Sequence, residues 1–179
     1  PRDGQYRRPR AEALKYRHIQ PNTNGLIRWL CFDIDHNDAA YRWEDVNTCP
    51  PSLVMVNPDN GHAHYAYALN IPVPKTEISR IKPLRYLSSI QEGMRKQLNA
   101  DIGYSGGLIK TPNHPDWYTL PFGGSYDLDE MAEYCTLPTR EEMKRITANT
   151  DYAGLGRNCT LFEQVRTQAY KDERKYFQI

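Results

Sequence analysis

Residues 26–35 read LIRWLCFDID, a nearly continuous apolar run that ends in two aspartates. A short apolar run rich in β-forming residues is typical of a strand buried in the centre of a sheet. Side chains two positions apart on a strand point to the same face, so Asp33 and Asp35 should lie side by side where the strand ends. The run therefore predicts a central strand from Leu26 to Ile34 with a pair of carboxylates at its end.

The next two segments predict a β-hairpin. Residues 52–56 read SLVMV, and residues 62–69 read HAHYAYAL with alternating character. The turn NPDNG at residues 57–61 ends in Asn-Gly, a dipeptide that favours tight hairpin turns. The alternation also places His62 and His64 on one face of the second strand.

Apolar residues at a spacing of three to four predict an amphipathic helix that ends at Leu98. The apolar positions are Ile78, Ile81, Leu84, Leu87, Ile90, Met94 and Leu98. A proline inside a helix costs roughly 3 kcal/mol, so the regular helix should begin near Pro83, with Ile78 and Ile81 in a preceding turn. A short strand at residues 106–110 is predicted to follow.

Two later helices are predicted from capping boxes, TREE at residues 139–142 and TLFE at residues 160–163. In each box the hydroxyl and the last carboxylate satisfy backbone N–H groups at the helix start. Glycines just before the second box indicate a break, so we expect a domain of residues 1–150 and a helical extension of residues 151–179. This order of elements predicts an α+β fold with a mixed or antiparallel sheet and flanking helices.

The composition is that of a soluble globular protein. The 179 residues are 39% hydrophobic and 25% charged, with a formal net charge of +1, which excludes a uniformly basic protein. No apolar stretch approaches the roughly 20 residues that cross a bilayer, so no membrane partner is expected. The four cysteines lie far apart without a C-x-x-C pair, which predicts reduced thiols in a cytoplasmic protein and no zinc site.

The N-terminal region is locally basic. Residues 1–28 contain seven basic and two acidic residues. A mobile basic arm can bind phosphates, and Arg7, Arg8 and Arg17 are its candidate residues. An ordinary solvated terminus has the same composition, so the charge alone leaves both interpretations open.

Two neighbouring carboxylates need a positive partner. At about 4 Å they repel by roughly 1 kcal/mol at the dielectric constant of water and by about 4 kcal/mol at the effective value near 20 used for protein sites. Mg²⁺ and Mn²⁺ offset such repulsion and keep positions open for water and phosphate. An aspartate-rich turn, with Asp38 close behind, is the structural alternative for Asp33 and Asp35.

Three more residues next to predicted strands fit a metal and phosphate site. Asp101 follows the long helix, His64 lies on the hairpin, and Lys110 ends the glycine-rich segment GYSGGLIK. Each has a simpler interpretation, as a helix end, a hairpin residue or an exposed lysine. The tyrosines and the HPDW segment at residues 114–117 fit either the core or stacking on single-stranded bases.

The chain is similar to a known family in five segments. They are YRHIQPN (16–22), WLCFDID (29–35), NGHAHYAYAL (60–69), LNADIGYSGGLIKTPNHPDW (98–117) and GRNCTLFEQVRTQAY (156–170). Together they resemble the catalytic region of plasmid Rep proteins, the replicase family within the archaeo-eukaryotic primase superfamily, and in particular the initiator primases of small theta-replicating colicin-type plasmids. The resemblance implies a primase-like fold with an RRM-like catalytic core and a C-terminal helical extension toward a DNA-binding region.

The resemblance also assigns roles to residues. It implies that Asp33, Asp35 and Asp101 are the catalytic carboxylates and hold Mg²⁺ or Mn²⁺ in a two-metal site. His64 falls on the second-motif histidine, which implies contact with the triphosphate of the incoming nucleotide. The family pattern has one histidine at this place, whereas this chain has two, so His62 competes for the role.

Lys110 falls where such enzymes place a basic residue near phosphates, which implies nucleotide binding. Tyr65 and Tyr67 alternate away from His64 and are expected in the core. A basic surface drawn from Arg7, Arg8 and Arg17 is expected to bind the template.

The implied function is that of a plasmid replication initiator primase, a nucleotidyltransferase that makes a short primer at the plasmid origin. The implied partners are single-stranded or origin DNA, nucleoside triphosphates and a host replication polymerase, in the bacterial cytoplasm. Such proteins continue into an origin-binding domain, so the chain is expected to be a fragment of a longer Rep protein.

Two other functions use the same residues. A non-catalytic nucleic-acid-binding module with a primase-like fold would rely on the basic arm, and its affinity would fall steeply with salt. Phosphatases with a D-x-D nucleophile need Thr or Val soon after the second aspartate, where this chain has His36, Asn37 and Asp38. The sequence therefore favours nucleotidyl transfer over phosphatase chemistry.

Overall fold

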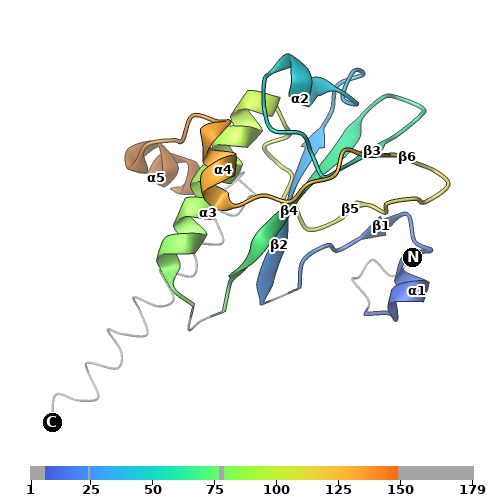
Figure 1. The fold of residues 1–179 in the computed structure, drawn as a ribbon, viewed down its shortest axis with the longest axis horizontal. Helices are drawn as coiled ribbons and strands as arrows, with labels where there is room; N and C mark the ends of the chain where they lie inside the picture. Colours follow the sequence, from blue (N-terminus) through green and yellow to red (C-terminus); the bar gives the residue numbers. More distant parts are fainter. Residues whose placement is uncertain (1–6, 24, 77–78, 149–179) are drawn as a thin grey trace, which may run out of the picture.

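The protein is built around a four-stranded antiparallel sheet (Figure 1). The structure is a computed structural model that describes residues 7–23, 25–76 and 79–148. The strand order is β2-β4-β3-β6, with bounds Leu26–Ile34 (β2), Ala63–Pro74 (β4), Leu53–Val56 (β3) and Tyr118–Pro121 (β6). The predicted α+β class with an antiparallel sheet and flanking helices is confirmed.

The hairpin of β3 and β4 forms as predicted. Its turn is closed by hydrogen bonds from the Asn57 N–H to the His62 carbonyl, at 2.8 Å, and from the Gly61 N–H to the Asn57 carbonyl, at 2.9 Å. Strand β4 runs on to Pro74, beyond the predicted end at residue 69, and its last residues pair with the start of β2 past a register shift. Proline is tolerated there because β3 does not reach this part of β4, so no ladder N–H is needed on that side.

The prediction that residues 26–34 form a central strand is wrong about position. Strand β2 lies at one edge of the four-stranded sheet and pairs with β4 alone. It is apolar at most positions because both of its faces are largely covered. Leu30 and Phe32 face the core under the helices, whereas Cys31 belongs to a second cluster on the opposite face.

The main core lies between the sheet and the helix α3, Ile81–Leu98, with α4, Leu128–Glu133, beside it (Figure 1). Leu87, Ile90 and Met94 of α3 are fully buried. The helix begins at Ile81, which corrects the expected start near Pro83. A proline fits the first turn because the N–H groups there have no partner within the helix.

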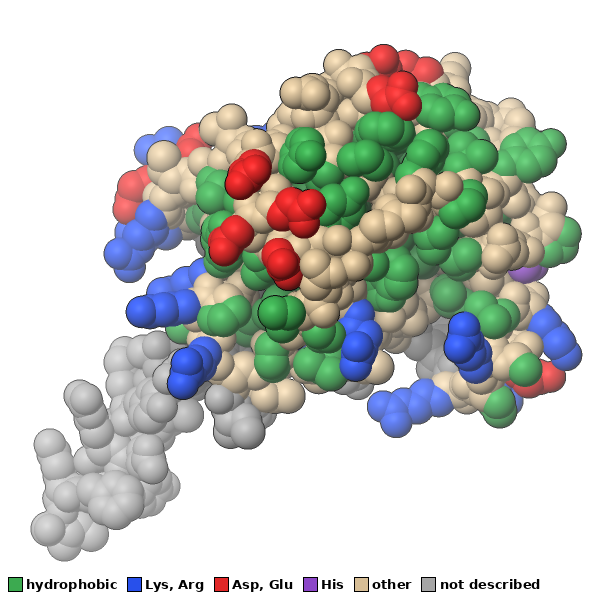
Figure 2. All heavy atoms as spheres, viewed as in Figure 1, with side chains coloured by type: hydrophobic (Ala, Val, Ile, Leu, Met, Phe, Trp, Pro, Cys, Tyr) green, Lys and Arg blue, Asp and Glu red, His purple; other side chains and the backbone are tan. Residues whose placement is uncertain are grey.

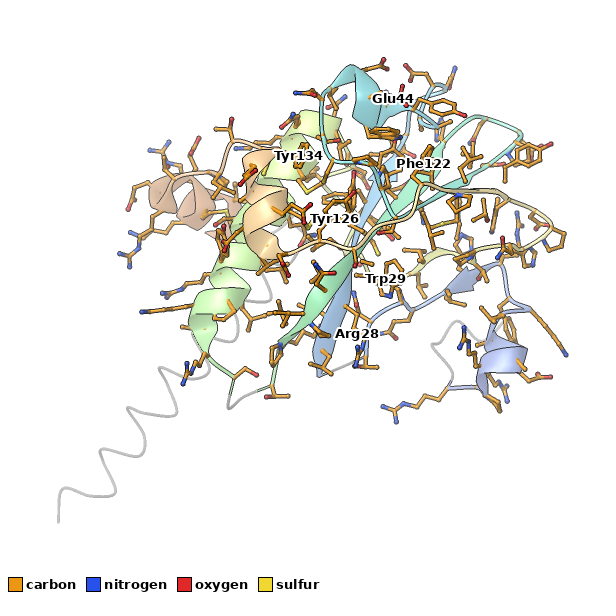
Figure 3. The ribbon with its side chains drawn as sticks, viewed as in Figure 1. Arg28, Trp29, Glu44, Phe122, Tyr126 and Tyr134 are labelled. Atoms are coloured by element: carbon orange, nitrogen blue, oxygen red, sulfur yellow. The ribbon has the colours of Figure 1, made fainter. Side chains whose placement is uncertain are left out.

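Tyrosines fill much of this core. Tyr65 and Tyr67 are fully buried, as predicted, and their rings lie 6.4 Å apart. Tyr126 is buried as well and its hydroxyl donates to the Pro50 carbonyl at 2.7 Å (Figure 3). Outside the core, Phe122 is partly exposed and packs edge-on against Trp43, with ring centroids 5.2 Å apart (Figure 3).

A separate pair of short strands, β1 (His18–Ile19) and β5 (Ile109–Lys110), lies beside the other face of the sheet. Strand β5 is shorter than the predicted strand at residues 106–110. Ile109 packs with Cys31 and Met55 of the sheet, so the pair covers part of that face. This arrangement brings the segment before β2 next to the chain that follows α3.

The remaining described helices are α1 (Arg10–Ala13), α2 (Arg42–Asp45) and α5 (Arg140–Ala148). The predicted capping box of α5 is confirmed, since the Glu142 N–H donates to Oγ1 of Thr139 at 3.2 Å and the Thr139 N–H donates to Oε2 of Glu142 at 2.7 Å. The second box and the extension at residues 151–179 lie outside the described residues, and the expected domain division is not tested.

Charges are unevenly distributed over the surface. Acidic side chains gather over α4, and lysines and arginines line the lower margin of the same view (Figure 2).

Three of the cysteines, Cys31, Cys49 and Cys135, are free thiols, as predicted. Burial raises the pKa of Cys31 to about 12, which makes this thiol unreactive. None of the described helices is both long enough and hydrophobic enough to span a membrane.

Candidate active site

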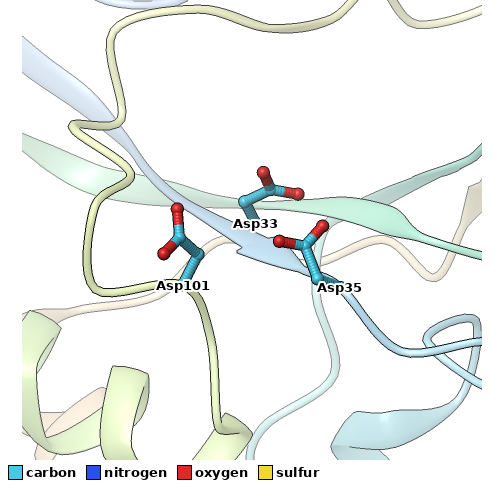
Figure 4. A group of neighbouring side chains, drawn as sticks. All are labelled: Asp33, Asp35 and Asp101. Atoms are coloured by element: carbon cyan, nitrogen blue, oxygen red, sulfur yellow. The ribbon is translucent and has the colours of Figure 1, made fainter.

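Three carboxylates from two distant parts of the chain meet at the end of β2 (Figure 4). Asp33 is the second-to-last residue of the strand, and Asp35 directly follows the strand. Asp101 lies in the loop after α3. One ligand oxygen from each lies within 4.8 Å of the other two. The structure thus brings together the three residues that the sequence predicted as metal ligands.

Backbone hydrogen bonds hold Asp101 in this place. Helix α3 ends at Leu98, and its C-cap Asn99 has a left-handed conformation with φ 54° that turns the chain back toward β2. The Asp101 N–H then donates to the Asp33 carbonyl at 2.9 Å. The Oδ1 atom of Asp101 accepts a hydrogen bond from the Gly103 N–H, also at 2.9 Å, which orients the carboxylate.

An ion pair in α3 supports the same loop. Glu92 is almost completely buried, and both of its oxygens accept hydrogen bonds from the Arg95 guanidinium, at 2.8 and 2.9 Å. The same guanidinium donates to the Ala100 carbonyl at 3.2 Å. Arg95 therefore connects a buried carboxylate of the helix to the residue that precedes Asp101.

His64 approaches Asp33 from the neighbouring strand. Nε2 of His64 lies 3.2 Å from Oδ1 of Asp33, and the two residues are directly opposite each other in the β2–β4 register. Nδ1 of the same ring accepts a hydrogen bond from the Lys110 N–H at 3.0 Å. Because Nδ1 is an acceptor, the ring proton of neutral His64 lies on Nε2, toward the carboxylates.

His62 pairs with the other aspartate of the strand end. Its Nδ1 lies 3.0 Å from Oδ1 of Asp35. Both side chains are partly exposed, whereas the side chain of His64 is buried. Each predicted histidine therefore has its own aspartate, and His64 is the one enclosed within the site.

The charges around Asp33 favour its ionised form. Partial burial raises the pKa of Asp33, but the nearby His64 side chain, and then the charges of Lys110 and His62, lower it by more, so the pKa lies below its usual value of 3.8. Burial lowers the pKa of Lys110, and the charges of Asp33 and Asp35 oppose that effect. The net pKa of Lys110 lies below its usual value of 10.5.

The donor set fits a hard divalent cation. Oδ1 of Asp33 is buried and, although Nε2 of His64 is near, no donor among the described residues is aligned to form a hydrogen bond with it. A buried carboxylate oxygen without a hydrogen bond is costly unless a cation binds it. Carboxylate oxygens are the ligands that Mg²⁺ and Mn²⁺ prefer, so Asp33, Asp35 and Asp101 could hold such an ion.

The predicted basic residues are distributed unequally around this site. Lys110 is buried beside His64, with Nζ 5.8 Å from the centroid of the Trp117 ring. The Arg17 guanidinium lies 4.8 Å from the same centroid and forms an ion pair with Asp116 at 2.7 Å.

Arg7 and Arg8 are exposed and precede α1. Of the three arginines predicted to bind the template, Arg17 is placed beside the site, because its guanidinium lies over the same Trp117 ring as the ammonium group of Lys110.

Several residues near the site were missed in the sequence. Arg95 fits the periodicity of a solvated helix face, so no pattern marked it out. His18 lies in a strand of two residues, which is too short to show alternation. Trp117 fits either the core or stacking on bases by its sequence pattern, and the structure buries it next to Arg17 and Lys110.

Comparisons with known proteins place this site in a family context. No curated protein matches the chain. Among solved structures, the chain is similar to the AEP domain of the cyanophage S-2L primase-polymerase (PrimPol), with 14% sequence identity and a TM-score of 0.49. The match covers 63% of this chain and 62% of that one, so the chain spans less than two thirds of the length of that domain.

The model of the Replicase family matches residues 1–135, well over half of the 179 residues. The matched range contains the strand end with Asp33 and Asp35, both histidines of β4, and the loop with Asp101. The resemblance found in the sequence segments is thereby confirmed at the level of the family: the chain belongs to the Replicase family.

Proposed function

We propose that the protein is a plasmid replication initiator primase, a nucleotidyltransferase that joins nucleoside triphosphates into a short primer on a DNA template. The observation that carries the proposal is the convergence of Asp33, Asp35 and Asp101 in a member of the Replicase family. These side chains would hold the Mg²⁺ or Mn²⁺ ions. When bound, such ions lower the pKa of a 3′-hydroxyl and neutralise the charge of the triphosphate.

The histidine and the lysine beside the carboxylates supply donors for phosphate oxygens. Nε2 of His64 lies 3.2 Å from Oδ1 of Asp33 without forming a hydrogen bond to it, so its N–H is available to a phosphate bound beside the metal. Lys110 carries three donors on a buried side chain, and in the described part of the chain its ammonium group forms no hydrogen bond or ion pair. A phosphate group bound beside Lys110 would accept hydrogen bonds from these donors.

The DNA template would approach from the basic N-terminal side. Arg17 is exposed, lies next to the site and is held over Trp117. Arg7 and Arg8, which are also exposed, extend the positive charge of this segment. Phosphate contacts of this kind are independent of sequence, and they would weaken as the salt concentration rises.

The test is primer synthesis from labelled nucleotides. The protein is incubated with ribonucleotides or deoxyribonucleotides, a single-stranded template, and Mg²⁺ or Mn²⁺, and the products are separated by length. We expect synthesis by the wild type that is lost in Asp33→Asn and Asp101→Asn. Asp45→Asn, an exposed aspartate of α2, is the matched control and should keep full activity.

Folding of each variant is checked by circular dichroism, so that loss of activity is not loss of structure. Synthesis at the wild-type rate by folded Asp33→Asn would contradict the proposal. Metal-independent DNA binding without any synthesis would instead favour the non-catalytic nucleic-acid-binding module.

A further inference from the structure

His18 lies beside the candidate active site although no motif includes it. The β1–β5 pairing places it directly opposite Lys110. Its ring centroid lies 6.3 Å from that of His64 and 5.6 Å from that of Trp117. The imidazole is therefore next to both groups that the proposed function assigns to nucleotide phosphates.

The backbone around His18 is firmly anchored. The Arg17 carbonyl accepts hydrogen bonds from the Thr111 N–H, at 2.8 Å, and from Nε1 of Trp117, at 2.9 Å. Oγ1 of Thr111 donates to the Tyr16 carbonyl at 2.6 Å. These bonds fix the residues that precede His18, and the pairing with Lys110 fixes His18 itself.

The imidazole, in contrast, has unused hydrogen-bonding capacity. Within the described ranges its ring nitrogens form no hydrogen bond or ion pair, and the ring lies against the rings of His64 and Trp117. The side chain is exposed, so it can reach a ligand. An anchored backbone that presents an unpartnered imidazole beside an unpartnered ammonium group is the arrangement that a phosphate group would complete.

The positions of Asp33, His64 and His18 relative to one another indicate where that phosphate would bind. His64 is next to Asp33 at 3.2 Å, and His18 lies on the side of His64 that carries Lys110. A nucleotide whose reacting phosphate lies at the carboxylates would thus extend its remaining phosphates past His64 toward His18. The neighbouring cations make this end of the site electropositive, and burial together with their charges holds the pKa of His18 below its usual value.

We propose that His18 binds the terminal phosphate of the nucleotide and thereby makes the site prefer triphosphates to monophosphates. This inference rests on the proposed function. It is separate from the metal-binding claim, because His18 would act on the end of the nucleotide remote from the carboxylates. A hydrogen bond to a charged group is typically worth enough to change affinity by about tenfold or more.

The test measures the affinity of the intact chain for a nucleoside triphosphate and the matching monophosphate in the presence of Mn²⁺. We expect His18→Ala to weaken triphosphate binding about tenfold and to leave monophosphate binding unchanged. His18→Gln, which keeps an amide donor, should recover part of the loss. Lys15→Ala removes an exposed cation of the same segment and should change neither affinity.

A second measurement does not depend on a variant. In an NMR spectrum of the histidine side chains, the His18 signals should shift on addition of the triphosphate and stay unchanged with the monophosphate. Equal losses of triphosphate and monophosphate affinity in His18→Ala would overturn the inference. So would a variant that weakens only the binding of a single-stranded oligonucleotide.

The failure of this inference can be told from the failure of the proposed function. If the wild type binds triphosphate in a metal-dependent manner but His18→Ala binds it equally well, only the role of His18 is refuted. If the wild type binds no nucleotide, the proposed function and the role of His18 are refuted together.

Discussion

His64 faces Asp33 across the β2–β4 pair, with Nε2 3.2 Å from Oδ1, and a backbone donor on a third strand fixes the ring in that orientation. The Lys110 N–H occupies Nδ1, so the neutral ring presents Nε2–H to the carboxylates. The position of one proton therefore depends on the docking of β5 against the sheet. This relationship connects the part of the site that would hold metal with the part that would hold phosphate.

Substitution of His64 should separate stability from activity. Asparagine places an amide oxygen near the position of Nδ1, so His64→Asn should still accept the Lys110 N–H but lack the Nε2 donor. His64→Ala leaves that buried N–H without a partner, which costs about 1–3 kcal/mol in the free energy of unfolding. We expect both variants to lose primer synthesis, and His64→Ala alone to show this loss of stability in urea unfolding. Equal stability of the two variants would refute the assigned role of the Lys110 N–H.

Arg95 should affect metal binding through the Ala100 carbonyl, which directly precedes Asp101. Arg95→Met removes the bidentate partner of the buried Glu92 and leaves Lys96, whose Nζ lies 3.8 Å from Oε1, as a weaker partner. Removal of one partner from a buried ion pair typically costs up to about 3–5 kcal/mol of stability. The double variant Glu92→Gln, Arg95→Met removes the buried charge and should recover part of that loss. Its affinity for Mn²⁺ should remain below that of the wild type, because the Ala100 carbonyl is no longer held. A double variant that binds Mn²⁺ as tightly as the wild type would show that Arg95 is only structural.

The stability of the protein should depend on His18 in a defined pH range. The pKa of His18 lies below its usual value of 6.5 because of partial burial and then of four basic neighbours, which are His64, Lys110, Arg17 and His114. As the pH falls below 6.5, the unfolded chain binds a proton that the folded protein resists, so the wild type loses stability.

His18→Gln lacks this effect. As the pH is lowered from 7.5 to 5, thermal melts should therefore show the melting temperature of His18→Gln rising relative to that of the wild type. These two pH values lie roughly one unit above and more than one unit below the usual histidine pKa. A difference that stays constant over this range would mean that the pKa of His18 is not lowered by its neighbours.

Gly61 and Gly123 form a matched pair for testing the packing of the β3–β4 turn. Both have positive φ angles, 75° and 77°, so alanine at either position costs about 1–2 kcal/mol in backbone strain. A Cβ atom at Gly61 would lie 2.1 Å from the Asn37 carbonyl oxygen, whereas nothing lies within 4 Å at Gly123. Gly61→Ala should therefore lower the free energy of unfolding clearly more than Gly123→Ala. Equal losses would show that the turn does not pack against the loop that follows Asp35.

Much of the fold could be predicted because its elements have strong local patterns. The apolar run of β2, the alternation in β4 and the three-to-four spacing in α3 each match one period of regular structure. The position of β2 at the sheet edge could not be predicted, because a strand covered on both faces has the same composition at the edge as in the centre. The extension of β4 to Pro74 depends on a register shift between Ile27 and Trp29 of β2, which has no signal within β4 itself.

The candidate site was predictable only in part, for a similar reason. Asp33 and Asp35 are marked by a strand end and His64 by alternation, whereas Asp101 depends on a hydrogen bond to the Asp33 carbonyl that forms only in the folded chain. His18 reaches the site through a two-residue strand pairing. Contacts of this kind between distant segments leave no periodic trace in the sequence.

The central claim is that Asp33, Asp35 and Asp101 together hold a divalent metal ion. Isothermal titration of Mn²⁺ into the metal-free wild type, Asp101→Asn and the control Asp45→Asn tests it most directly. We expect the wild type and Asp45→Asn to bind Mn²⁺ equally, and Asp101→Asn to bind it more than about tenfold more weakly, since even indirect changes to a metal site reduce affinity by that much. Asp101→Asn should unfold no more easily than the wild type without metal, because it removes one of three repelling charges. Unchanged Mn²⁺ affinity in folded Asp101→Asn would contradict the account.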